Sequence, residues 1–341
     1  MSKKEKAVLL VNLGTPDSPK VPDVRKYLRE FLLDKRVIDI NAIARWMLVN
    51  LIIAPFRAPK SAKTYRQLWE DRGSPLLFHG EDVVEKLKPL LPDNYSVHLA
   101  MRYQSPSIAN ALNEIKKENP EEIIVVPMFP QYASATTGSI HDKVMEYLRK
   151  WEIIPKITFI SQFFEHPDFI KAFAANGKKY VDKEDYDHVV FSYHGLPERQ
   201  IRKGSFKGYC QLNEKCCASY NKANRFCYRA QCFETSRLLA KELGLTPDDY
   251  TVCFQSRLGK DPWIQPYAED IIEKLAKEGK KKVLAYSPAF VADCLETTVE
   301  VGDEFREEFE EAGGEKWQLV ESLNSNDQWV NCLRSLILEP N

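Results

Sequence analysis

The sequence lacks an excess of charge of either sign and contains no long hydrophobic run. Its 48 lysine and arginine residues are balanced by 49 aspartate and glutamate residues, and the net charge is −1. This balance favours neither nucleic acid nor a strongly anionic surface as a partner. The longest apolar segment, Trp46–Phe56, has about half the length that a membrane-spanning helix needs.

The N-terminus also lacks the pattern of a secretory signal. After its first lysines, the apolar run of MSKKEKAVLLVNLG ends at a Gly-Thr-Pro turn, far short of a signal-peptide core with a cleavage site. With 44% hydrophobic and 28% charged residues, the composition is typical of a soluble globular protein. These features predict a cytoplasmic protein with one large domain or two of about 150 residues each.

Cysteine is scarce, with eight residues in 341, but its distribution is uneven. Five cysteines lie in one short segment: Cys210, Cys216, Cys217, Cys227 and Cys232. In a reducing compartment such a group indicates metal ligation sooner than disulfides. Four thiolates suit either a 2Fe–2S cluster or tetrahedral zinc. Because five cysteines compete for four places, the spacing leaves the ligand set open.

Short apolar segments alternate with amphipathic helical patterns along the chain. The predicted strands are Ala7–Leu13, Ser96–Met101, Ile123–Pro127, Val189–Ser192, Thr251–Gln255 and Val283–Tyr286. The predicted helices between them include Gly80–Leu91, Ser107–Glu118, Phe233–Leu243 and Tyr267–Glu278. Buried strands that alternate with helices predict an α/β fold with parallel sheets covered on both faces. Ligands of such folds bind at the carboxyl ends of the strands.

An internal repeat predicts two similar α/β lobes with a cleft between them. The motif NLGTP at residues 12–16 recurs as YHGLP at residues 193–197, each after an apolar strand. Residues 123–137 also align without a gap on residues 284–298. We expect a first lobe at residues 1–165 and a second at 166–341. The segment after Gly314 is expected to return to the first lobe.

His194 stands at the carboxyl end of a predicted strand, directly before a glycine. Its ring is therefore expected to point into the cleft, where an imidazole suits proton abstraction or metal ligation. A structural histidine that caps a turn is the alternative. The other five histidines lie in helical or charged settings, so we expect structural or surface roles for them.

A row of acids follows the equivalent strand end of the second lobe: Asp293, Glu296, Glu300 and Glu304. The three glutamates are four residues apart, which places them on one face of a helix, where like charges raise one another's pKa. A solvated acidic face is the usual explanation. Its position directly after a buried strand instead favours a path for protons or hard cations.

Aromatic and basic residues follow other predicted strands, among them Arg102, Tyr103, Tyr132 and Trp263. Singly, each is more often a packing residue. Together they indicate a cleft with aromatic walls that suits a large flat ligand. The apolar segment Trp46–Phe56 is expected either to form a hydrophobic lip or to be a buried helix.

Five segments resemble the signatures of the ferrochelatase family, in the family's order and over nearly the whole chain. They are VNLGTPDSP (Val11–Pro19), PQYASATTGS (Pro130–Ser139), SYHGLPER (Ser192–Arg199), QSRLGKDPW (Gln255–Trp263) and AFVADCLETTVE (Ala289–Glu300). The resemblance implies two Rossmann-like lobes around a porphyrin cleft. It also implies a reaction, in which ferrous iron enters protoporphyrin IX and two protons leave.

The resemblance assigns roles to individual residues. His194 matches the family's active-site histidine, as proton acceptor or early iron contact, and Glu296 matches the acid that faces it across the cleft. Asp293, Glu300 and Glu304 would extend an acidic path. The positions that match residues holding or distorting the macrocycle are Leu13, Arg102, Tyr103, Tyr132, Trp263 and Phe290. Cys294 stands where some members carry a second histidine, which leaves the metal preference open.

The cysteine-rich segment at 209–232 is where this sequence is distinctive. Some ferrochelatases carry a 2Fe–2S cluster, so the resemblance favours that cofactor over zinc or free thiols, with a structural or redox-sensing role. Cys232 lies nearest to a helix that cluster-free relatives share, which makes it the candidate spare ligand. Cys216 and Cys217 are adjacent, and both need not ligate.

Two other interpretations stay open. One keeps the fold and changes the substrate to coproporphyrin or to another tetrapyrrole. An apolar lip that contacts a membrane surface peripherally would favour a porphyrin with fewer carboxylates. The other is a non-catalytic protein that uses its cysteines to bind zinc or an Fe–S cluster, or to sense redox state. The pairing of His194 with Glu296 argues against it, because a pure binder needs no proton acceptor.

Overall fold

The computed structural model describes residues 4–259 and 261–339, which divide into two compact units. Unit 1 contains residues 4–129, 134–162 and 325–339, and unit 2 contains residues 130–133 and 163–324. Each unit is built on one four-stranded parallel sheet, with its helices on both faces. The prediction of two similar α/β lobes with parallel sheets is confirmed.

The sheet of unit 1 has the order β2-β1-β3-β4. Its strands are β1 (Lys6–Gly14), β2 (Tyr95–Tyr103), β3 (Glu122–Pro127) and β4 (Lys156–Phe159). Leu9 and Val11 of β1 pack with α5 (Ile108–Glu118) and α6 (Ser139–Leu148) on one face. On β1 and β3 nearly every side chain is buried, which explains their continuous apolar runs.

Helices α4 (Pro75–Leu87) and α13 (Asp327–Leu338) pack together in unit 1, with the short η2 (Lys88–Leu90) after α4. The ammonium of Lys86 ties α4 to the start of α13 through the Asp327 carboxylate, at 2.8 Å. The last helix of the chain therefore belongs to the same unit as the first strand.

A helical subdomain of unit 1 holds the segment from Trp46 to Phe56. It consists of α1 (Val21–Leu33), α2 (Ala42–Met47), the π-helix η1 (Leu48–Ile53) and α3 (Ala54–Leu68). The alanines of α3 at positions 54, 58 and 62 are fully buried, and α3 packs on α1. The larger apolar side chains face outward, with Phe56 79% and Trp46 54% exposed. The buried-helix alternative is therefore wrong.

The sheet of unit 2 repeats the order of unit 1, as β6-β5-β7-β8. Its strands are β5 (His188–His194), β6 (Tyr250–Gln255), β7 (Lys282–Tyr286) and β8 (Lys316–Leu319). Helices α11 (Ala268–Lys277) and α12 (Phe305–Glu311) cover one face around Trp317 and Phe309. The remaining long helices, α7 (Pro167–Val181) and α10 (Tyr228–Leu243), pack on each other.

Three features of the fold differ from the sequence-based expectation. The edge strands β4 and β8 were not predicted, because four residues with partly exposed side chains carry no clear apolar signal. His98 and His188 lie on strands, where His188 Nε2 contacts the Thr251 hydroxyl at 2.8 Å. The segments after β3 and β7 contain π-helices, η3 (Ser134–Gly138) and η5 (Leu295–Glu304).

Candidate active site

His194 is the last residue of β5, a central strand of the unit 2 sheet, and the following glycine lets the strand end against β6. A Cβ at Gly195 would lie 2.8 Å from the Gln255 carbonyl oxygen and 3.1 Å from the Trp263 ring. Only glycine fits this approach without displacing the neighbouring backbone. His194 Nδ1 lies 2.7 Å from the Gly195 carbonyl oxygen, and the Trp263 ring centroid is 6.3 Å from the imidazole.

Glu300, on η5, is the acid held most firmly in this region. The Ser256 hydroxyl lies 2.7 Å from both of its carboxylate oxygens, and Gln255 Nε2 donates to Oε2 at 3.0 Å. Burial raises the pKa of Glu300, against the opposing pull of the His194 charge. The imidazole and the carboxylate therefore interact electrostatically.

Gln255, at the end of β6, connects the acids to the sheet. Its side-chain oxygen accepts a hydrogen bond from Ser192 at 2.7 Å. Its amide nitrogen donates to the Glu296 carbonyl oxygen at 3.0 Å as well as to Glu300. The glutamine is almost completely buried, so all three bonds are protected from water. Sequence reasoning did not single out Gln255, Ser192 or Ser256 as site residues.

The four acids of the predicted row do not share one environment. Asp293 has a structural role, because its carboxylate accepts hydrogen bonds from the Asn324 side-chain amide at 2.7 Å and from the Ser322 N–H at 3.1 Å. Glu296 lies in the first turn of η5 and is partly buried, whereas Glu304 is exposed. Gln255 thus contacts the Glu296 backbone and the Glu300 carboxylate, and Asp293 has a structural hydrogen-bond network.

The helix that carries these glutamates is the π-helix η5, and a spacing of four residues also keeps side chains near one face of a π-helix. In a π-helix each N–H bonds five residues back, so a spacing of four falls just short of a turn instead of just beyond it. The raised pKa of Glu300 also comes mainly from burial, and repulsion by Glu296 contributes less. Single π-turns are frequent at functional sites.

The other predicted residues of unit 2 are aromatic and partly buried. Trp263 lies in the loop after β6, where its indole N–H donates to the Leu258 carbonyl at 3.0 Å. The Phe290 N–H donates to the Ser287 carbonyl at 3.1 Å, in the turn after β7. Tyr132 belongs to the short segment of residues 130–133, and its ring meets the edge of Phe226 at 5.8 Å.

In unit 1, Arg102 and Tyr103 end β2 and both contact Asp34. Arg102 donates to the Asp34 carboxylate at 2.6 Å and to the Ser139 hydroxyl at 2.6 Å. Burial opposes the charged form of Asp34, but hydrogen bonds from Ser139 and the Arg36 N–H, together with the Arg102 charge, lower its pKa. Asp34 therefore stays ionised and fixes the guanidinium. No sequence pattern pointed to it.

Tyr103 is fully buried, and its hydroxyl donates to Asp34 at 2.9 Å. It supports Arg102 from within the core rather than lining a surface, and burial raises its pKa. Leu13, near the end of β1, is partly buried against the core of unit 1. In the repeat, Leu13 occupies the place that His194 has in unit 2, since each precedes the glycine of its strand end.

The five clustered cysteines separate into a group of four and one outlier. Cys210, Cys216, Cys217 and Cys227 interact through their thiols, and the Sγ atoms of Cys216 and Cys217 are 3.9 Å apart. Cys232 is fully buried on α10 and interacts with the Tyr228 hydroxyl. No three His, Cys, Asp or Glu side chains within residues 4–259 and 261–339 are already arranged around a metal position.

Hydrogen bonding between the four thiols makes their acidities unequal. Donation from Cys227 lowers the pKa of Cys210 to about 6. The same donation, helped by the charge of Arg229, lowers the pKa of Cys217 to about 6. The same hydrogen bonds to Cys210 and Cys217 stabilise the protonated thiol of Cys227 and raise its pKa. The lowered pKa values of Cys210 and Cys217 favour the thiolate, which is the form that binds soft metals.

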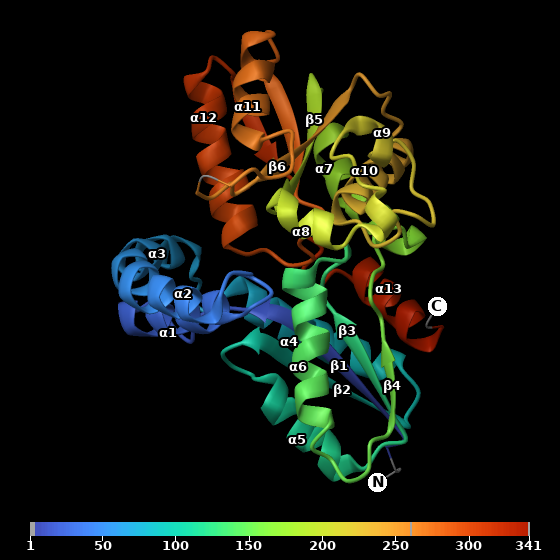
Figure 1. The fold of residues 1–341 in the computed structure, drawn as a ribbon. Helices are drawn as coiled ribbons and strands as arrows, with labels where there is room; N and C mark the ends of the chain where they lie inside the picture. Colours follow the sequence, from blue (N-terminus) through green and yellow to red (C-terminus); the bar gives the residue numbers. More distant parts are fainter. Residues whose placement is uncertain (1–3, 260, 340–341) are drawn as a thin grey trace. The chain divides into compact units, whose positions relative to one another are not determined.

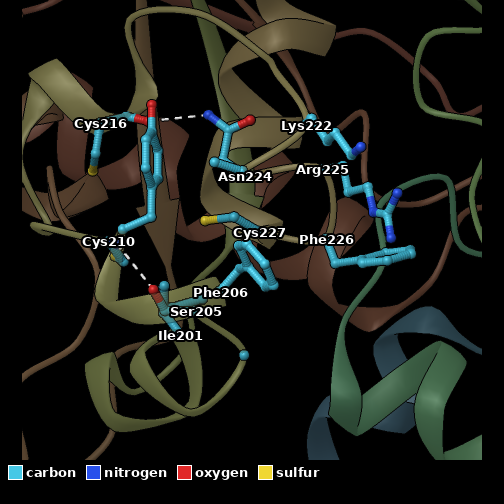
Figure 2. Close-up of a pocket in the computed structure, with 13 residues that line it drawn as sticks. Ile201, Ser205, Phe206, Cys210, Cys216, Lys222, Asn224, Arg225, Phe226 and Cys227 are labelled. Carbon is cyan, nitrogen blue, oxygen red and sulfur yellow. Dashed lines mark hydrogen bonds between the residues drawn. The ribbon is translucent and has the colours of Figure 1, made fainter.

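A cavity of about 380 Å³ adjoins three of these cysteines. Figure 2 shows Cys210, Cys216 and Cys227 among its lining residues, with Phe206 and Phe226. The segment that forms it contains α8 (Glu198–Lys203), η4 (Phe206–Gly208) and α9 (Glu214–Cys217). Asn224 secures the loop, since its amide donates to the Cys216 carbonyl at 3.1 Å.

The sequence as a whole matches one family model, described as Ferrochelatase, over residues 5–340. The chain belongs to the ferrochelatase family. The ferrochelatase of Legionella pneumophila (strain Lens) is 47% identical over 98% of this chain and 99% of the relative. That of Coxiella burnetii (strain CbuK_Q154) is 43% identical over 96% of this chain and 92% of the relative. The resemblance found in five sequence segments is thus confirmed.

Solved structures show the same fold at much lower sequence identity. SirB from Bacillus subtilis with Fe3+ has a TM-score of 0.54 at 13% identity, covering 98% of this chain and 95% of that structure. The sirohydrochlorin chelatase SirB from Bacillus subtilis subspecies spizizenii, in complex with cobalt, has a TM-score of 0.54 at 11% identity, over 98% of this chain and 97% of that structure. The ferrochelatase-family chain therefore shares a fold that chelatases use.

The buried carboxylate of Glu300 predicts a pH-dependent stability difference. Its pKa is higher in the folded protein than in an unfolded chain. The folded state therefore loses stability relative to the unfolded state as the pH rises from the unfolded-chain pKa through the folded-state pKa. Glu300→Gln removes the charge, and we expect it to melt a few degrees above the wild type at about pH 8, with the gap closing towards about pH 5. Thermal unfolding across this range measures the difference.

The exposed Glu304, on the same helix, gives a matched control. Glu304→Gln is expected to melt like the wild type at every pH. A stability gain in Glu300→Gln that does not change with pH would contradict the desolvation argument.

Proposed function

We propose that the protein is a ferrochelatase that inserts ferrous iron into protoporphyrin IX. Its products are protohaem and two protons, in the last step of haem synthesis. Membership of the family over nearly the whole chain carries this proposal. The grouping of His194 with Glu300 and Gln255 in unit 2 supports it, because iron insertion requires groups that accept protons.

The proposed chemistry removes two pyrrole protons as iron enters the ring. His194 accepts one of them or makes an early contact with the ferrous substrate. If the imidazole takes a proton, the ionised carboxylate of Glu300 stabilises the resulting imidazolium. Burial raises the Glu300 pKa above its ordinary value, which favours a role in proton transfer. Glu296 and the exposed Glu304 extend the acidic path along η5 towards solvent.

The macrocycle itself would be held by aromatic surfaces and one cation. Trp263, Tyr132 and Phe290 of unit 2, with Leu13 of unit 1, offer apolar contact area. Arg102 offers a guanidinium that Asp34 holds in a fixed orientation at 2.6 Å, which suits a propionate of the porphyrin. Tyr103 contributes indirectly by holding Asp34.

A second candidate substrate is coproporphyrin, which carries more carboxylates. Apart from Arg102, the residues proposed to hold the ring are aromatic or aliphatic, which favours the less charged protoporphyrin. Other tetrapyrroles and a non-catalytic binding role are further alternatives. An anaerobic assay with ferrous iron and each porphyrin separates them, since a binder would insert iron into none.

Replacement of His194 tests the proton-acceptor role. We expect His194→Ala to lower iron insertion by at least 100-fold, in line with the usual size of acid–base catalysis, while porphyrin binding is retained. Initial rates of haem formation and a fluorescence titration with protoporphyrin measure the two properties. His98→Ala is the control, because His98 lies on β2 and its side chain contacts the Glu118 carboxylate. Full activity in His194→Ala would exclude the role.

The cysteine-rich segment is proposed to hold a 2Fe–2S cluster. The donor set fits: the four cysteine side chains interact with one another, the pKa is lowered for two of them, and a cavity adjoins three of them. The proposed ligands are Cys210, Cys216, Cys217 and Cys227, with Cys232 as the spare cysteine. Such a cluster would supply a redox-active centre and cross-link the segment.

Two serine variants test this ligand set. Freshly purified wild type is expected to be brown, with broad sulfur-to-iron absorption in the visible range. Cys227→Ser should be colourless, whereas Cys232→Ser should keep the colour, because Cys232 stands apart on α10. Absorption spectra with iron and sulfide analysis measure this. A colourless wild type that contains zinc would refute the cluster.

A reversible contact with the cytoplasmic membrane surface is proposed for the apolar lip of unit 1. None of the helices within the described ranges is long and apolar enough to cross a membrane. Trp46, Leu51, Ile52 and Phe56 are exposed on one short helical stretch, and such a surface enters the headgroup region of a bilayer. The greasy substrate and product would pass between membrane and enzyme there.

Flotation with anionic liposomes tests the lip. We expect the wild type to float and Leu51→Asn to lower the bound fraction several-fold, because it removes apolar area from the contact. Ile153→Asn is the matched control, since Ile153 is an exposed isoleucine elsewhere in unit 1. Equal flotation of the wild type and both variants would rule out the lip.

A further inference from the structure

Gln231, in the first turn of α10, is completely buried and uses both ends of its amide. Its oxygen accepts the backbone N–H of Tyr132 at 2.6 Å. Its nitrogen donates to the Arg225 carbonyl at 2.6 Å. A buried amide satisfied in this way is costly to disturb. Gln231 therefore fastens the Tyr132 backbone to the cysteine-rich segment.

Phe226 makes the second contact between the same two segments. Its ring is 47% exposed, it meets the Tyr132 ring edge-on at 5.8 Å, and the Arg225 guanidinium lies 4.9 Å from its centroid. It also lines the cavity beside Cys227. Tyr132 is a proposed porphyrin contact, and the half-exposed Phe226 ring packed against it enlarges the aromatic surface that Tyr132 offers.

The backbone on either side of Phe226 is fixed by the cysteines. Asn224 donates to the Cys216 carbonyl at 3.1 Å, and the Cys227 N–H donates to the Asn224 carbonyl at 2.8 Å. The Gln231 N–H in turn donates to the Cys227 carbonyl at 3.0 Å. A continuous set of hydrogen bonds thus leads from two cysteines to the backbone of residue 132.

We propose that Phe226 is a substrate-positioning residue that extends the Tyr132 surface of the porphyrin site, and that the cysteine-rich segment sets porphyrin affinity through it and Gln231. This inference rests on the proposed function. It differs from a purely structural role for the segment because it predicts a change in porphyrin binding before any iron is inserted. Phe206 lines the same cavity and is also exposed, but makes no ring contact with Tyr132 among the described residues.

The pair Phe226→Ala and Phe206→Ala provides the test. Protoporphyrin is titrated into the purified full-length protein without iron, and its fluorescence and Soret band report binding. We expect Phe226→Ala to raise the Kd about five-fold, the size of one lost aromatic contact. Phe206→Ala should stay within about two-fold of the wild type. Thermal unfolding confirms that both variants are folded. Equal Kd values for the two variants would overturn the proposal.

Three further variants test the connection to the cysteines. Phe226→Tyr should keep the wild-type porphyrin affinity, because it retains the aromatic ring. Gln231→Met should raise the Kd as Phe226→Ala does. Cys227→Ser should also raise it, and adding Phe226→Ala to Cys227→Ser should cost less than in the wild-type background, because the two changes act on one contact. Unchanged porphyrin affinity in Cys227→Ser and Gln231→Met would overturn the coupling.

Iron insertion by the same samples separates the two claims. If the wild type inserts iron while Phe226→Ala and Phe206→Ala bind porphyrin equally, only this inference fails. If the wild type binds porphyrin but inserts no iron, the proposed function fails. In the steady state, Phe226→Ala is expected to raise KM for porphyrin about five-fold with kcat within two-fold, as loss of uniform binding requires.

Discussion

The buried amide of Gln255 holds the candidate site together. It joins β5 through Ser192, supports the backbone at Glu296 and donates to the Glu300 carboxylate. A carboxylate removed from water needs such donors to remain ionised at all. Gln255 thus connects the Glu300 carboxylate to the strand that ends at His194.

The two sheets share one strand order, but their strand ends have acquired opposite chemistry. Unit 2 offers an imidazole and a buried acid, where unit 1 offers Leu13 and a guanidinium clamped by Asp34. This division suits a reaction that moves protons and a cation while it holds a flat, anionic ring. The repeat explains the common scaffold, and the proposed separation of tasks follows from the side chains at the strand ends.

The sequence alone predicts the central strands and the place of His194 at a strand end. A continuous apolar run usually forms a buried strand, and a following glycine usually marks the end of that strand. It does not predict the π-helix at η5, since a spacing of four residues fits an α-helix equally well. Asp34 and Gln231 were not found either. Each makes hydrogen bonds to residues that are distant along the chain, and no local pattern records such contacts.

The π-helix at η5 has a consequence for how this family member can evolve. A π-helix holds about one more residue per turn than an α-helix. Deletion of one residue between Glu296 and Glu300 would therefore tighten that turn towards an α-helical turn. That deletion would rotate every later side chain of the helix and carry Glu300 away from Gln255. The position of Glu300 against Gln255 thus depends on the number of residues in the turns of η5 as well as on their identity.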